Sequence, residues 1–176
     1  MNPGWMGGIH TQFSAESDYN STGKGWSVFL LPEEIEDAVT RLYDHEFFLE
    51  DISAMDSKDG LVVIYHLDHF IHPGRVALYV LIQHKNPEIP SISSIFSGAE
   101  WHEREVHDFF GIRFTGHREL DPLLLPEDAG YHPLIKEQNR RACLNEVLNP
   151  GQVVETSSDF QLFQKKEVKD TYGSRA

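Results

Sequence analysis

Cysteine is almost absent from this sequence. Cys143 is the single thiol among 176 residues. One cysteine cannot close an internal disulfide, and an iron–sulfur cluster is normally held by four thiolates. The chain is therefore not expected to carry electrons through a cluster of its own, unless another chain supplies the remaining ligands. A low cysteine content also fits a reducing compartment.

Long apolar runs are missing as well. The longest, Val76 to Ile82, is far shorter than the roughly 20 residues of a transmembrane helix. Residues 1–25 are rich in Gly, Ser, Thr and Asn and lack the basic and apolar regions of a secretory signal. We therefore expect no direct membrane insertion.

Basic residues are scarce, with 15 Lys and Arg against 28 Asp and Glu, so the net charge is −13. Such a charge repels phosphate backbones and anionic lipid headgroups. Nucleic acid is thus not expected as a partner, and neither is direct docking on a lipid surface. A protein partner with a basic surface would have a compatible charge.

What the sequence does contain is enough apolar character, 40% of residues, for one domain with a core of its own. Residues 1–25 have the composition of a flexible N-terminal arm. Residues 26–137 hold the periodic segments and are expected to form an α/β domain. Residues 138–176 are mostly polar and aperiodic, which predicts an extended tail that packs on partner subunits.

The first periodic segment predicts a helix that starts at Leu31-Pro32-Glu33-Glu34 and fades near His45. Proline at a first helical position loses no hydrogen bond, and acidic residues there favour the positive end of the helix dipole. Apolar residues follow at helical spacing: Ile35, Ala38, Val39 and Leu42. This spacing indicates a helix packed on one face.

Three strand candidates come next, over residues 47–55, 61–69 and 75–84, joined by short turns at residues 56–60 and at Pro73-Gly74. Two hairpin-like connections in succession predict an antiparallel meander.

Two helices are expected after these strands. A short helix is predicted over residues 91–97 and a stronger one over Ala99 to Phe110, where Gly111 can close the helix. Prolines and glycines make the chain from residue 116 to residue 137 an ordered loop. The fold class is therefore α+β, a small mixed or antiparallel sheet covered by helices on one face and followed by an extended C-terminal segment.

The ten histidines raise the question of a metal site. His66, His69 and His72 are three apart, and on a strand this spacing points side chains to opposite faces. His102 and His107 resemble an H-E-x-x-H zinc motif, but they are five apart rather than four, roughly 140° from one another on a helix. Ordinary strand-end and helix-surface histidines are the favoured interpretation.

A remote alternative is a free-standing metalloenzyme using Glu103, His107 and His117. Glu103 and His107 are four apart and could share a metal ion, which would need a third ligand from elsewhere. No serine or cysteine lies in a recognisable nucleophile motif.

The helix over residues 99–110 also suits a docking surface. It carries a dense charged patch, Glu103, Arg104, Glu105, His107 and Asp108, beside three aromatic residues, Trp101, Phe109 and Phe110. Arg104 and Asp108 are spaced for an ion pair. The alternative is a solvated helix face, in which such a pair contributes only about 0.3–0.5 kcal/mol. Arginine and aromatic side chains next to an ordered loop favour the docking interpretation.

The segment Trp101 to His117 strongly resembles the signature of the 30-kDa subunit family of respiratory complex I, which runs roughly W-x-E-R-E-x-x-D-x-F-G-I-x-F-x-G-H. Ten further positions match: Glu103, Arg104, Glu105, Asp108, Phe110, Gly111, Ile112, Phe114, Gly116 and His117. The order of elements also matches the family's domain, so the resemblance covers about Trp26 to Glu137.

The resemblance implies a non-catalytic subunit that binds no cofactor and no metal. Such a subunit lies in the peripheral arm, on the cytoplasmic face of the cell membrane, and clamps the large electron-transfer subunit beside the small iron–sulfur subunit. It has no active site of its own. The resemblance implies a partner-interface motif of Trp101, Glu103, Arg104, Glu105, Asp108, Phe110, Gly111, Phe114, Gly116, His117 and Pro133.

The sequence departs from the quinone-linked members after His117. They continue with P-x-L-R-R-I-L, whereas this chain lacks the paired arginines and has Leu125-Pro126-Glu127-Asp128. This variant is similar to the membrane-bound [NiFe]-hydrogenase and formate hydrogenlyase branch, which is the expected parent complex. The alternative is the same kind of subunit in a quinone- or F420-linked dehydrogenase of the complex I type.

Overall fold

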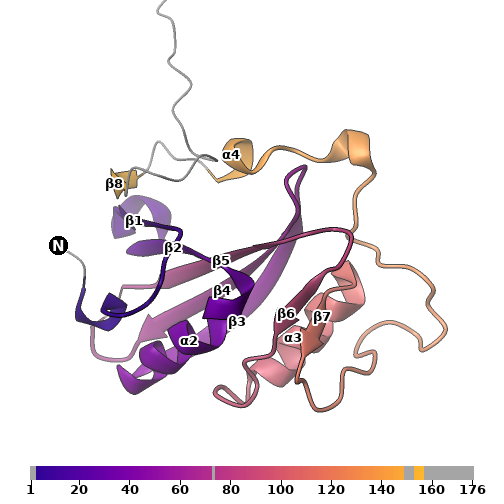
Figure 1. The fold of residues 1–176 in the computed structure, drawn as a ribbon, viewed down its shortest axis with the longest axis horizontal. Helices are drawn as coiled ribbons and strands as arrows, with labels where there is room; N and C mark the ends of the chain where they lie inside the picture. The colour runs from indigo at the N-terminus through magenta and orange to yellow at the C-terminus, as the bar shows by residue number, and fades with distance from the viewer. Residues whose placement is uncertain (1–2, 73, 149–152, 157–176) are drawn as a thin grey trace, which may run out of the picture.

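The computed structural model describes residues 3–72, 74–148 and 153–156, and its centre is a six-stranded sheet (Figure 1). The strand order is β3-β4-β5-β2-β1-β8. The strands are β1 (Phe13–Ser17), β2 (Trp26–Leu30), β3 (Phe47–Asp56), β4 (Leu61–His69), β5 (Val76–Ile82) and β8 (Val153–Thr156). A second, two-stranded sheet pairs β6 (Glu88–Pro90) with β7 (Arg113–Thr115) in parallel.

Helices occupy the connections between strands. The α-helices are α1 (Tyr19–Thr22), α2 (Ile35–Asp44), α3 (Ala99–Phe110) and α4 (Leu144–Val147), and the 3-10 turns are η1 (Gly4–Met6), η2 (Pro32–Glu34) and η3 (Gln138–Arg140). The predicted start at Pro32 and end near His45 of the first long helix are confirmed, and so are both ends of α3. No helix in the described part of the chain has the length and hydropathy needed to cross a bilayer.

The predicted antiparallel meander is confirmed. β3 pairs with β4, and β4 with β5, in antiparallel register. β2 then pairs with β5 in parallel, with Val28 opposite Leu78, and β1 is antiparallel to β2. The sheet is therefore mixed, as the predicted α+β class allows.

The sheet buries both of its faces. One face packs against α2 and α3 and holds the larger core, in which Val63, Tyr65 and Leu78 are completely buried. Successive side chains of a strand point to opposite faces, so the neighbouring positions, including Ile64 and Tyr79, form a smaller core on the other face. Figure 1 shows α2 and α3 on one side of the sheet and α4 on the other.

Two expectations about short segments are wrong. Residues 1–25 have the composition of a flexible arm, but Phe13–Ser17 is a strand of the main sheet, where Phe13 and Ala15 enter the smaller core. The period-two alternation of this segment outweighs its polar composition. Residues 91–97 form turns and no helix, although Phe96 N–H does donate to the Ile92 carbonyl.

Residues 138–148 return to the domain itself. Leu144 is 1% exposed in the smaller core, and its backbone N–H donates to Asp59 at 2.8 Å. Lys58 N–H donates to the Ala142 carbonyl. This part of the predicted tail therefore closes the second face of the sheet. Residues 149–152 and 157–176 of the tail lie outside the described residues.

Candidate docking surface

Helix α3 is the element that carries the signature segment. Its buried residues Ala99, Glu103, Val106 and Phe110 recur at intervals of three and four, so one stripe faces the sheet beside β3. Gly111 ends the helix with φ +68°, and its N–H donates to the His107 carbonyl. The left-handed conformation at this position favours glycine.

Asp108 holds the start of the loop that follows β7. Its side chain is buried, and Oδ2 accepts the backbone N–H groups of Leu123, Leu124 and Leu125 at 2.9, 2.7 and 3.1 Å. Burial alone would raise the pKa of Asp108, but these three N–H groups outweigh it, and the pKa is lowered. The carboxylate is therefore a fixed anchor for this turn.

Arg104 holds the residues just before that turn. Its Nε donates to the Asp121 carbonyl at 2.9 Å and its Nη2 to the Pro122 carbonyl at 3.0 Å. The guanidinium also lies 5.7 Å from the centre of the Trp101 ring. Arg104 and Asp108 therefore do not form the expected ion pair, because each side chain binds the backbone of the loop instead.

A later part of the loop, at residues 132–134, is attached to the C-terminal end of α3. His132 Nδ1 lies 2.8 Å from the Asp108 carbonyl oxygen, and Leu134 N–H donates to the Phe109 carbonyl at 3.1 Å. A Cβ atom at Gly111 would lie 2.6 Å from His132 Cδ2. Glycine is thus required here both by the backbone conformation and by the approach of the His132 ring.

Asp56, at the end of β3, holds the far end of the loop. Its fully buried carboxylate accepts Lys136 N–H at 2.8 Å, Arg141 Nε at 3.0 Å and His84 Nε2 at 2.7 Å. Burial acts to raise the pKa of Asp56, but the His84 and Lys136 hydrogen bonds and the charge of Arg141 outweigh it and lower it.

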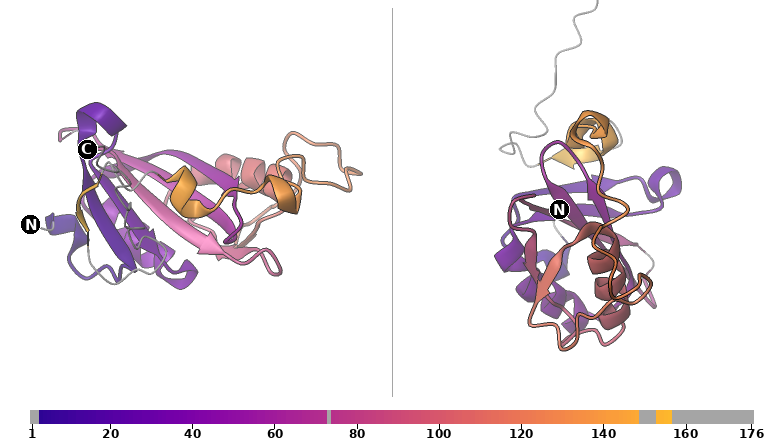
Figure 2. Two further views of the ribbon diagram at one scale, coloured as in Figure 1. Left: turned by 90° about the horizontal axis from the view of Figure 1, so that it is seen from above. Right: turned by 90° about the vertical axis from the view of Figure 1, so that its right-hand side faces the viewer.

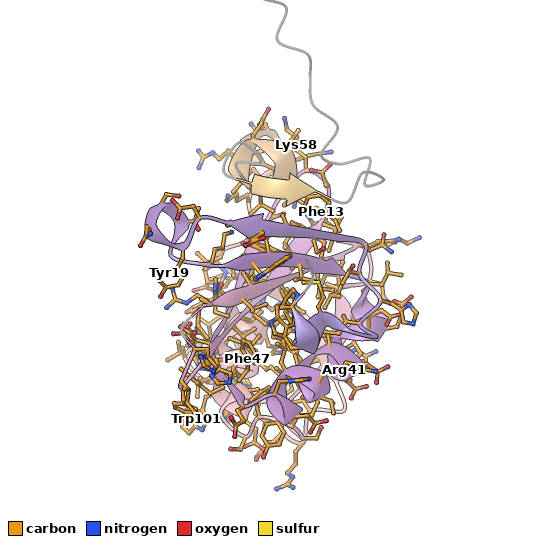
Figure 3. All side chains as sticks on the ribbon, turned by 90° about the vertical axis from the view of Figure 1, so that its left-hand side faces the viewer. Phe13, Tyr19, Arg41, Phe47, Lys58 and Trp101 are labelled. Atoms are coloured by element: carbon orange, nitrogen blue, oxygen red, sulfur yellow. The ribbon has the colours of Figure 1, made fainter. Side chains whose placement is uncertain are left out.

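Residues 116–137, which we call the docking loop, therefore have little regular structure yet are fixed at residues 121–125, at residues 132–134 and at residue 136. Figure 2 shows this loop projecting beyond α3 at one end of the molecule. The loop and α3 together expose large apolar side chains to solvent: Trp101 (64% exposed), Leu124 (59%), Tyr131 (60%), Leu134 (48%) and Ile135 (38%). We call these five side chains the docking surface, as the candidate site for a partner. In Figure 3, Trp101 lies at the outer edge of the molecule.

The structure divides the predicted interface motif into two groups. Glu103, Asp108, Phe110 and Phe114 are buried, and the His117 side chain is only 2% exposed, so these residues build the support of the surface. Five positions are exposed or half-buried in addition to Trp101: Arg104, Glu105, Gly111, Gly116 and Pro133. Only this second group can contact a partner directly.

Sequence reasoning missed several residues of the site. Asp56 and Arg141 are separated by 85 positions and His132 and Asp108 by 24, so no local pattern reveals either contact. Leu124, Leu134 and Ile135 did carry a signal, since aliphatic residues in a proline-punctuated loop have no element of their own to bury them.

Two pairs of histidine rings are neighbours, with ring centres 5.3 Å apart for His69 and His72 and 6.2 Å apart for His107 and His132. His102 Nδ1 lies 3.3 Å from Asp51 Oδ1, and His107 Nδ1 lies 2.9 Å from the Ile112 carbonyl. His69 Nδ1 accepts the N–H groups of Ile71 and His72 and so shapes the turn after β4. Within the described ranges, no group of three His, Cys, Asp or Glu side chains is placed to hold a metal ion.

Residues 28–142 match the family model described as "Respiratory-chain NADH dehydrogenase, 30 Kd subunit". The matched range contains both Asp56 and Arg141, so it includes every anchor of the docking loop.

Three curated relatives are informative. The C subunit of the NADH-quinone oxidoreductase of Roseiflexus castenholzii is 41% identical over 118 residues, covering 63% of this chain and 68% of the relative. The C subunit of the F(420)H(2) dehydrogenase of Methanosarcina mazei is 38% identical over 98 residues, 54% of this chain and 60% of the relative. The C/D subunit of the NADH-quinone oxidoreductase of Phocaeicola vulgatus is 35% identical over 130 residues, 70% of this chain but only 25% of that longer protein.

A solved structure has the same fold. It is a chain of the membrane-bound sulfane sulfur reductase, described as an archaeal respiratory membrane complex, with a TM-score of 0.58. The two chains share 22% identity, and the alignment covers 84% of this chain and 85% of that one. This likeness concerns the fold alone.

Proposed function

Because the chain belongs to the family of the 30-kDa subunit of respiratory-chain NADH dehydrogenase, we propose that it is a non-catalytic peripheral subunit of a membrane-bound, complex I-type oxidoreductase. In that complex it binds the larger electron-transfer subunit through the docking surface. The observation that carries this proposal is a loop of little regular structure that is fixed by two buried carboxylates, Asp108 and Asp56, and still exposes its apolar side chains.

Rigidity is what suits this loop to binding. Ordering a flexible loop at an interface costs about 0.5–1.5 kcal/mol per immobilised side chain, and a pre-ordered loop avoids much of that cost. Contiguous exposed apolar surface with a polar rim is characteristic of protein–protein contact sites. Trp101 and Tyr131 are of the residue types that most often dominate binding energy at such sites.

The rim of the surface adds a charge preference. The exposed acidic residues of the docking loop are Glu119, Asp121, Glu127, Asp128 and Glu137, against two exposed basic ones, Arg118 and Lys136. With a net charge of −13 for the whole chain, the complementary partner is an apolar patch rimmed by Lys and Arg. Charge at the rim chiefly accelerates association and excludes wrong partners.

Two observations point to different parent complexes. The Leu125–Asp128 segment, which lacks paired arginines, favours a membrane-bound [NiFe]-hydrogenase or formate hydrogenlyase. The names of the Roseiflexus and Methanosarcina relatives favour a quinone- or F420-linked dehydrogenase. The cysteine pattern of the large subunit separates the two, because an intact [NiFe] site needs two CxxC pairs in that subunit.

The remaining parts of the proposal follow from membership of such a complex. The chain would reach the cytoplasmic face of the membrane only through its partners, which include the small iron–sulfur subunit. In the Phocaeicola relative, the region similar to this chain is about a quarter of a longer protein. Such an arrangement supports a close association of this domain with a second subunit.

The alternative of a free-standing metalloenzyme has little geometric support. Glu103 already accepts hydrogen bonds from Ser91 and Ile92, and His107 faces the Ile112 carbonyl. Elemental analysis of the purified chain tests it, since one equivalent of zinc or iron would contradict the scaffold role.

A pair of matched variants tests the docking role in the source organism. Leu134 on the docking loop and Val147 on α4 are both 48% exposed. A tagged chain carrying Leu134→Asp should lose the large subunit during purification, whereas Val147→Asp should retain it. Circular dichroism of both isolated variants controls for folding. Recovery of the large subunit at the wild-type level with Leu134→Asp would contradict the proposal.

A further inference from the structure

A buried carboxylate lies beneath the docking surface, between α3 and the sheet. The Glu103 side chain is completely buried. Its Oε1 accepts Ile92 N–H at 2.7 Å, and its Oε2 accepts the Ser91 hydroxyl at 2.6 Å. Glu103 thereby fastens the turn at residues 91–92 to α3.

No basic side chain neutralises this carboxylate in the part of the chain that the structure describes. Its one ion-pair neighbour is His117, with Nε2 at 3.9 Å from Oε2. His117 Nδ1 accepts Glu119 N–H, so the ring hydrogen is on Nε2, which faces the Glu100 carbonyl at 3.2 Å. This ring is therefore turned toward backbone groups and does not act as the counter-ion.

The other neighbours also disfavour a charge. Burial, the largest influence, raises the pKa of Glu103 to about 7 against the opposing hydrogen bonds of Ser91 and Ile92, and the negative charge of Glu100 raises it further. From the sheet, β4 contributes Tyr65, whose buried hydroxyl has no hydrogen-bond partner in the described structure. Burial and the charge of Glu103 both raise the pKa of Tyr65 well above its usual value.

A chain of hydroxyl groups connects Glu103 to the surface. Ser91 Oγ lies 2.6 Å from Glu103 Oε2 and 2.8 Å from Ser93 Oγ, and Ser93 is half-buried next to the exposed Ser94. Each hydroxyl can donate to one neighbour while it accepts from the other. The two hydroxyl groups can therefore orient their hydrogen bonds to suit either the neutral or the ionised form of the Glu103 carboxyl group.

We propose that Glu103 is a buried proton-binding site, which takes up one proton on Oε2 and exchanges it with solvent through the hydroxyls of Ser91 and Ser93. In the neutral state the new Oε2–H bond donates to Ser91, whose own hydrogen turns to Ser93. On release, the Oε2–H bond breaks, Ser91 again donates to the carboxylate, and the proton leaves from Ser93 to water. The ligand of this site is a single proton.

This site goes beyond the docking role and does not depend on it. Its consequence is that α3 is attached to the sheet more firmly when Glu103 is neutral, because release of the proton leaves an uncompensated charge beside Tyr65. Arg104 and Asp108 lie on the same helix, so the support of the docking loop becomes sensitive to pH near neutrality.

Carboxyl-carbon NMR of the full chain labelled with ¹³C-glutamate tests the site directly. One glutamate carboxyl should titrate with a midpoint at about pH 7, and this resonance should be absent from the Glu103→Gln variant. The control is Glu105→Gln, which changes an exposed glutamate of the same helix and should leave the resonance in place.

Two results would overturn the proposal. One is that every glutamate carboxyl of the wild-type chain has titrated below about pH 5.5, the ordinary range. The other is that the near-neutral resonance persists in Glu103→Gln. If Glu103→Gln does not fold, Ser91→Ala provides the second test. Loss of the Ser91 donor should move the midpoint upward, and an unchanged midpoint would count against the site.

Discussion

The Oδ2 atom of Asp108 lies 2.7 Å from the backbone nitrogen of Leu124. This hydrogen bond joins α3 to the docking loop, because Asp108 is buried on the helix while the Leu124 side chain is 59% exposed. A carboxylate that accepts several backbone N–H groups is a strong anchor, since bonds to charged groups contribute about 1.5–3 kcal/mol. The docking surface thus depends on a side chain that a partner cannot touch.

Asp108→Asn tests this anchor. The amide keeps one oxygen acceptor but loses the charge and turns an NH₂ group toward backbone donors, so the free energy of unfolding should fall by about 2 kcal/mol. Urea unfolding measures the change. The control is Asp121→Asn, at an exposed position, which should alter stability by less than about 0.5 kcal/mol. Equal effects of the two substitutions would contradict the anchoring role.

Gly111→Ala should detach residues 132–134 of the docking loop from α3. A side chain there meets both an unfavourable φ of +68° and the His132 ring at 2.6 Å, so a loss of roughly 1–3 kcal/mol is expected. Limited proteolysis should then cut between residues 121 and 136 faster than in the wild-type chain.

Gly98→Ala is the matched control for that experiment. Gly98 has φ −63°, and an added Cβ meets no atom within 4 Å. This substitution should change stability by less than about 1 kcal/mol, because the lower flexibility of the unfolded chain opposes the small loss of replacing glycine by alanine at the N-cap of α3. A similar loss at both glycines would show that the contact with His132 is unimportant.

Local sequence pattern predicts much of the fold. Helix α3 follows from the apolar residues at helical spacing and from Gly111, and the meander follows from three apolar runs with turn residues between them. The strand β1 is not predicted, even though Phe13 and Ala15 alternate with polar residues, because the overall composition of residues 1–25 indicates a flexible arm.

The site is predicted less completely for a physical reason. Glu103 shares the buried stripe of α3 with Val106 and Phe110, but its charge suggests a place on the exposed patch. The contacts that hold the loop join residues far apart in the chain, such as Asp56 with Lys136. Only the folded backbone brings such groups together, so no spacing rule can find them.

Acid should weaken the attachment of the far end of the docking loop. The pKa of Asp56 is below its ordinary value of 3.8 in the folded chain. The corresponding stabilisation is therefore present above about pH 4 and is lost as the pH falls through the lowered pKa. Unfolding midpoints between pH 5 and pH 2 should decline more steeply for the wild-type chain than for Asp56→Asn, and parallel profiles would refute this contribution.

A rise in pH from about 4.5 to about 7 should destabilise the folded chain through Glu103. The folded chain holds a proton up to about pH 7, whereas the unfolded chain releases it near the ordinary value of 4.5. The stabilisation is complete below pH 4.5 and is lost as the pH rises to about 7. Over this range the unfolding equilibrium constant should increase by at most about tenfold per pH unit. Glu103→Gln should remove this decline between pH 5 and pH 8, as measured by urea unfolding. A decline that is unchanged in the variant would assign it to another group.

Hydroxyl-radical footprinting of the free chain and of the assembled complex tests the central claim most directly. Trp101 and Tyr131 are 64% and 60% exposed in the free chain and should be oxidised several-fold more slowly in the complex. Tyr19, which is 43% exposed on α1, is a comparison residue away from the docking surface. Protection of Trp101 and Tyr131 is the result that we predict. Oxidation of both at the same rate in the free chain and in the complex would contradict the docking role of this surface.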